Sequence, residues 1–217
     1  PFLNWMRDSD ILASDSKNIT EIGKILQSKY MLHPVVVWEI IWVNLTCNSE
    51  ICNWFAFNIA YGHNYTKSEV EMLMETTLDM YSSSVRKNAL GSLQNAFVSS
   101  SLGEKLQVGV ITKVNNKQVF SRFPHNDISL VAVAYSFYRY AERQKRYMLT
   151  VSEFYDENQK EGIYRQFGIS RETFEKLLLS LQEESNHVLR AELNMGLDNI
   201  ILREDLTSKD ILKLMLK

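Results

Sequence analysis

Basic residues gather in one segment of the chain, and this segment could bind phosphate. Between residues 86 and 146 there are ten lysines and arginines against three acidic residues, an excess of seven positive charges in a chain of net charge −2. The run YRYAERQKRY (138–147) interleaves tyrosines with basic residues, a mixture that suits phosphate contacts combined with base stacking. The sequence therefore predicts a single nucleic-acid-binding surface. Its residues are Lys113, Lys117, Arg139, Arg143, Lys145 and Arg146.

The same residues have a second interpretation that involves no nucleic acid. Arg143, Lys145 and Arg146 fall near the end of an expected helix. Positive side chains are favoured there by the helix dipole, so an ordinary solvated helix end would have the same composition. The residue types alone leave both interpretations open.

Motifs of known catalytic chemistry are absent from the sequence. It contains no Gly-rich phosphate loop, no HExxH and no GxSxG, so no catalytic residue is predicted. The four histidines are scattered, and we expect caps or loop positions for them rather than metal ligands. They are His33, His63, His125 and His187.

Four carboxylates at helical spacing are candidates for a metal site. Glu69, Glu71, Glu75 and Asp79 could converge on a divalent cation, which prefers oxygen ligands. A solvated acidic helix face is the preferred interpretation, so we predict no metal site and no evident cofactor. A divalent metal is expected only if the chain is a nuclease.

The elements that must position these residues are mainly helical. The chain has 217 residues, 45% apolar and 23% charged, which is ordinary for a globular protein of one or two domains. Residues 33–61 hold three tryptophans and both cysteines. Their spacing predicts two buried helices in a hairpin, the first begun by Pro34, with Trp42 and Trp54 in the core. The two cysteines are expected to be reduced, as in a cytoplasm.

Capping residues mark the starts of the other helices. In two segments the apolar residues follow the alternating pattern of strands instead of the helical period. Helix starts are expected at Asn18, Thr66, Ser83 or Ser84, Asp127, Thr150, Ser170 and Thr207. β-Hairpins are expected at about 106–122, around Asn115-Asn116, and at 187–203, around 194–196. The predicted fold is thus a mainly α, bundle-like core with two small hairpins.

The order of segments resembles one bacterial family. The run ITEIGKIL, a Pro-started Trp-rich helix, WFAFN, a TKSEV helix start, LDNIILRED and TSKDILKLM resemble the domain-of-unknown-function 4007 family, from about Ile19 to the C-terminus. Members begin with a winged-helix-like segment, so the resemblance implies that 1–30 is the tail of that segment in a truncated member. Residues 31–217 would form the helical domain, with a subdivision near 103–125.

The resemblance also implies a setting for the function. Members lie beside genes for DNA phosphorothioation and phage defence, and one relative is described as a DNA-nicking protein. The chain is therefore expected to be a cytoplasmic, DNA-interacting subunit of such a system, with DNA and other proteins of the complex as partners and no membrane. The alternatives are a nicking endonuclease, whose dispersed metal-dependent site could span a homodimer, and a protein-interaction scaffold.

Overall fold

Helices form most of the chain, which confirms the predicted fold class. The computed structural model describes residues 2–183, 187–194 and 196–217, and in these ranges it has twelve helices and six strands. In chain order they are α1 Phe2–Asp8, α2 Glu21–Lys29, α3 Pro34–Asn48, α4 Glu50–Asn58, β1 Asn64–Thr66, α5 Lys67–Thr77, α6 Ser83–Ser99, α7 Ser101–Glu104, β2 Val110–Val114, β3 Lys117–Ser121, α8 Leu130–Gln144, β4 Met148–Thr150, α9 Val151–Phe154, α10 Ile163–Phe167, α11 Arg171–Glu183, β5 Leu189–Glu192, β6 Asn199–Leu202 and α12 Ser208–Met215.

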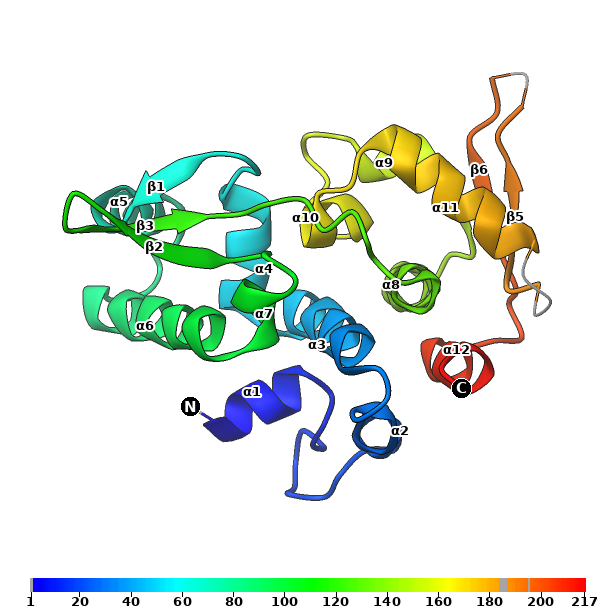
Figure 1. Cartoon of the computed structure of the whole chain (residues 1–217), viewed down its shortest axis with the longest axis horizontal. Coiled ribbons are helices and arrows are strands. Elements are labelled where there is room, and N and C mark those ends of the chain that lie inside the picture. Colours follow the sequence, from blue (N-terminus) through cyan, green and yellow to red (C-terminus); the bar gives the residue numbers. More distant parts are fainter. Residues whose placement is uncertain (1, 184–186, 195) are drawn as a thin grey trace.

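The Trp-rich hairpin forms the centre of the molecule (Figure 1). Helix α3 begins at Pro34, and α4 follows after Ser49 at an angle of 98°. Trp42 and Trp54 are buried, as predicted. The Trp42 indole donates to the Gln166 carbonyl (2.8 Å), so the polar edge of this large ring is satisfied inside the core.

The first predicted hairpin is confirmed. Strands β2 and β3 pair antiparallel around Asn115 and Asn116, which have φ values of 49° and 61°, the left-handed geometry of a tight hairpin turn. The short strand β1 adds to the other edge of β3, giving the order β1-β3-β2. Three residues give no alternating pattern in sequence, so β1 was not predicted.

The second hairpin is confirmed as well, and it too gains a strand. Strands β5 and β6 pair antiparallel, and β4 pairs with β6 in the order β4-β6-β5. Within the predicted turn at 194–196, residue 195 lies outside the described residues.

Helix starts were predicted correctly in most places and wrongly in a few. Thr66, Thr150 and Thr207 form capping boxes. Helix α2, however, is capped by Thr20 instead of Asn18, because the Thr20 hydroxyl accepts the Gly23 amide (2.8 Å). Asparagine, aspartate, serine and threonine can all cap a helix, so the start is easily misplaced by one or two residues where several of them lie close together in the sequence. For the same reason, α6 is capped by Ser82, and α8 by Ser129.

Two groups of elements flank α3 (Figure 1). One contains the β1-β3-β2 sheet with α5 and α6; the other contains α8 to α12 and the β4-β6-β5 sheet. The segment after β3 crosses from the first group to α8 and passes α10. One buried apolar cluster runs from Leu26 of α2 to Leu216 after α12. The domain boundaries expected near residues 30 and 103–125 stay predictions.

Across the described ranges no single helix is long and apolar enough to cross a membrane; α3 and α4 reach that length and apolarity together, but across their sharp bend.

Candidate nucleic-acid interface

Three arginines predicted to contact phosphate lie in α8 or just after its end, and all three are held by carboxylates; they are called the α8 arginines below. Nη2 of Arg139 lies 2.8 Å from Oδ2 of Asp10. Arg143 donates to Glu161 (2.7 Å) and Arg146 to Glu153 (2.9 Å). All three acids come from other parts of the chain, so their positions could not be read from the composition of the 138–147 run.

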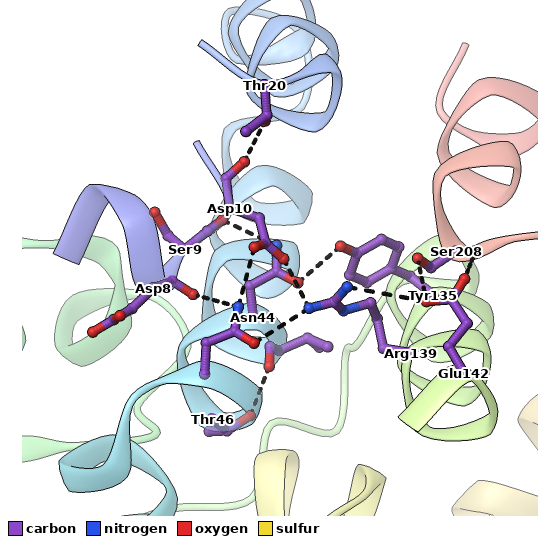
Figure 2. A network of polar contacts seen from close by, with 12 residues as sticks. Asp8, Ser9, Asp10, Thr20, Asn44, Thr46, Tyr135, Arg139, Glu142 and Ser208 are labelled. Atoms are coloured by element: carbon purple, nitrogen blue, oxygen red, sulfur yellow. Dashed lines mark hydrogen bonds and ion pairs between the residues drawn. The ribbon is translucent and has the colours of Figure 1, made fainter. Parts of the chain in front are cut away.

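Arg139 belongs to a polar network that joins four elements (Figure 2). Asp10 follows α1, and it also accepts a hydrogen bond from Asn48 of α3 (3.2 Å). Glu142 of α8 lies 4.0 Å from Arg139 and accepts from both the amide (2.7 Å) and the hydroxyl (3.0 Å) of Ser208. Burial raises the pKa of Asp10, although Arg139 opposes the shift. This network fixes α1 and α12 to α8, so Arg139 has a structural role.

The two lysines of the β2–β3 hairpin point away from each other. Lys113 pairs with Gln118, whereas Lys117 pairs with Val114. Paired residues share a face and successive residues alternate, so the two lysines project from opposite faces. Lys145 is exposed at the C-cap of α8, with φ of 52°.

The single surface predicted for these six residues is therefore not formed. The hairpin turn lies at one end of the molecule, far from α8 along the long axis (Figure 1), and the α8 arginines are ion-paired. The prediction failed because an excess of local charge does not specify which carboxylates the fold will bring to it. That any one of these residues contacts DNA stays a prediction.

A different cationic site is built around Arg122, which is 0% exposed. The Arg122 guanidinium donates from Nη1 to the carbonyls of Ala56 (2.7 Å) and Ile59 (3.1 Å) at the end of α4. It donates from Nη2 to the carbonyl of Arg165 (2.6 Å) in α10, and from Nε to that of Val108 (3.1 Å). The negative ends of helix dipoles face this cation, which explains how a buried arginine is tolerated.

No carboxylate neutralises Arg122 among the residues that the structure describes. Its closest side-chain partner is Tyr61, whose ring centroid lies 4.0 Å from the guanidinium carbon. The Tyr61 hydroxyl accepts from Nη2 (2.5 Å) and donates to the Arg165 carbonyl (3.0 Å). Burial raises the pKa of Tyr61 to about 12, so this phenol is neutral near pH 7 and leaves the charge of Arg122 in place.

A pocket of about 310 Å³ lies beside Arg122, where α4 meets α10. Cationic and aromatic side chains dominate the part of its lining that the structure describes, and no carboxylate residue belongs to that lining. This combination favours an anionic ligand with a flat ring. The charged and aromatic lining residues are Phe57, Tyr61, His63, Arg122, Tyr164 and Arg165.

Arg165 and Lys160 place further positive charge over Phe57. Their cationic groups lie 4.9 Å and 5.6 Å from the Phe57 ring centroid. Arg165 uses Nε and Nη2 to hold the carbonyls of residues 159, 156 and 157, while its Nη1 has no hydrogen-bond partner among the described residues. Lys160 is exposed and forms no ion pair with a described residue. Both groups can donate to an incoming anion.

Sequence reasoning missed this pocket. Arg122 falls within the basic segment 86–146, but Phe57, Tyr61, Tyr164 and Arg165 belong to no predicted site. The two walls come from residues near 60 and near 164, and nothing in their local spacing indicates that they meet.

The other candidate ligands have structural roles or no grouping. Glu69 accepts from the Thr66 amide (2.7 Å) in a capping box, and His125 contacts the buried Glu39 (2.7 Å). Within residues 2–183, 187–194 and 196–217, no group of three His, Cys, Asp or Glu side chains could hold a metal ion.

Comparison with known proteins identifies the fold but no family. No protein-family model matches the sequence, and no curated protein matches it either. Among solved structures, a magnesium-ion-bound crystal structure of SspB matches with a TM-score of 0.74 and 13% sequence identity, covering 99% of this chain and 74% of that chain. The chain therefore shares its fold with SspB over nearly its whole length.

Proposed function

We propose that this chain is a DNA-interacting subunit of a bacterial DNA-modification and phage-defence complex of the phosphorothioation type, acting in the cytoplasm with other proteins of that complex. The resemblance to the domain-of-unknown-function 4007 family motivates the setting, and the fold shared with SspB is compatible with it. The pocket between α4 and α10 is the observation that carries the DNA contact.

The proposed contact depends on positively charged side chains that form no ion pair with a carboxylate of the described residues. Arg165 lines the pocket together with the buried Arg122. The Lys160 ammonium lies 5.6 Å from the ring centroid of Phe57, which also lines the pocket. Each phosphate that such groups neutralise releases about 0.9 of a condensed counterion, so affinity falls steeply with salt. The α8 arginines would first have to leave their carboxylates, which makes them weaker phosphate ligands.

The test is a salt titration of binding to a fluorescent DNA duplex, followed by anisotropy. The double variant Lys160→Gln/Arg165→Gln should bind more weakly. The plot of log affinity against log salt should become flatter, with a slope about 1.8 less negative, for two phosphate contacts. Lys160→Gln alone should make the slope about 0.9 less negative. This substitution removes no side-chain hydrogen bond that the structure describes.

The matched control is Lys113→Gln/Lys117→Gln, which removes the same two charges from the hairpin. This variant should keep the parent slope. If it flattens the slope and the pocket variant does not, DNA binds at the hairpin instead of the pocket. A parent protein that binds neither duplex nor single-stranded DNA, even at about 50 mM salt, would refute the proposed function and favour the scaffold alternative.

The nicking alternative has a separate assay. The SspB structure carries a magnesium ion, but the described residues of this chain offer no cluster of ligands for one, and we assign no step to a metal. Supercoiled plasmid incubated with the protein and Mg²⁺ or Mn²⁺ should remain supercoiled. Conversion to the nicked form would instead show an endonuclease.

A further inference from the structure

We propose that the pocket between α4 and α10 holds a single nucleotide that is unstacked from its neighbours, with the phosphate on Arg165 and Lys160 and the base against the aromatic lining. The inference rests on the proposed function, because DNA would supply the nucleotide. It goes further, because it makes single-stranded or locally opened DNA the preferred ligand over a regular duplex.

The shape of the site argues for a projecting group. A protein that follows duplex phosphates needs cations on an open surface and has no use for rings in a recess. Here a concavity of about 310 Å³ is lined by Phe57, Tyr61 and Tyr164, with His63 at the same site. A base inside a duplex presents only its edges in the grooves, so its face can reach these rings only after it leaves the stack.

Some hydrogen-bond donors at the site are already bonded within the fold, and others have no partner among the described residues. The N–H groups of Arg122 are engaged with carbonyls and with Tyr61, so Arg122 contributes charge without a direct contact. Among the described residues, neither Nη1 of Arg165 nor the Tyr164 hydroxyl has a hydrogen-bond partner. These two groups and Lys160 are therefore the ones that can bind a phosphate or a base edge.

The pocket is also preorganised. The Tyr164 ring packs against Tyr155 (5.1 Å between centroids) and Tyr61 (6.1 Å). Gly168 has φ of 67°, and a Cβ there would lie 2.6 Å from the Tyr61 ring, so glycine permits this close packing. Rings that are held before binding lose little side-chain freedom when a ligand arrives.

The test compares three labelled oligonucleotides of one sequence and length: a single strand, a perfect duplex, and a duplex with an abasic site opposite one adenine. We expect the 217-residue chain to bind the first and third more tightly than the perfect duplex, by roughly 5- to 150-fold, the range of one base–aromatic stack. Tyr164→Leu should abolish this preference and leave duplex binding and its salt slope unchanged. Tyr30→Leu is the control for loss of an exposed tyrosine elsewhere and should behave as the parent.

A titration with dAMP, compared with inorganic phosphate, separates the pocket from long DNA. Binding of dAMP that is weakened by Tyr164→Leu supports the inference; equal affinity for dAMP and phosphate contradicts it. If all three oligonucleotides bind equally and Tyr164→Leu changes nothing, the inference is wrong while the proposed function stands. If no oligonucleotide binds, the proposed function is wrong, and absence of dAMP binding then overturns the pocket as well.

Discussion

Replacing Arg122 with methionine should destabilise the protein more than any change to the predicted basic surface. The variant keeps a long apolar side chain but removes all five N–H donors. It leaves the carbonyls of Val108, Ala56, Ile59 and Arg165 without their donor, and Val108, Ala56 and Ile59 are buried residues. Ala56 and Ile59 lie at the end of α4 and Arg165 lies in α10, so the loss affects the place where these two helices meet.

The size of the effect follows from those contacts. Each buried acceptor left unsatisfied costs about 1–3 kcal/mol, and the substitution leaves the four carbonyls named above without this donor. We take about 3–5 kcal/mol as the expected loss, because local relaxation recovers part of the sum. For a chain of this size, that lowers the melting temperature by roughly 6–20 °C.

The measurement is urea unfolding followed by tryptophan fluorescence and by circular dichroism. Arg190→Met is the matched control, because Arg190 is 67% exposed and pairs with Glu192; it should change the unfolding free energy by less than about 1 kcal/mol. Arg122→Lys retains the charge with three donors at one point, and should fall between the two. A loss below about 1 kcal/mol for Arg122→Met would refute the argument that this guanidinium holds the two helix ends together.

Three further predictions concern the core, a thiol and a surface ion pair. Trp42→Ala should cost about 3–5 kcal/mol in urea unfolding, since it empties a buried site and removes the bond to the Gln166 carbonyl; unfolding together with the parent would contradict this. Burial raises the pKa of Cys52 to about 12, so its reaction with a disulfide reagent at about pH 8 should be limited by unfolding, and fast labelling of the native protein would be inconsistent with this. Lys209 and Lys213 hold the pKa of Glu21 at about 2, below its usual 4.5. The ion pairs of Glu21 therefore stabilise the folded protein above the unfolded pKa, and this contribution is lost as pH falls toward 2. Glu21→Gln should thus lower the melting temperature near pH 6 and have a much smaller effect near pH 2, and an equal effect at both values would count against the pairing.

Local chemistry in the sequence determined most of the secondary structure. A threonine followed three residues later by an acid satisfies helix amides within one turn, which is why the starts of α5, α9 and α12 could be predicted. Asn115 and Asn116 tolerate positive φ and have strand-like apolar runs on both sides, so the first hairpin was predictable from local sequence. The apolar periodicity of 33–61 likewise placed Trp42 and Trp54 in the core.

Tertiary structure alone decided which charges are free. Arg139 and Arg143 looked available because their acids, Asp10 and Glu161, are distant in sequence. Arg165 looked unremarkable because its place beside Phe57 depends on how α10 packs against α4. Composition records how many charges a segment has, whereas the electrostatic energy of each depends on partners within a few ångströms. Those distances are set by folding, and so the candidate site emerged only from the structure.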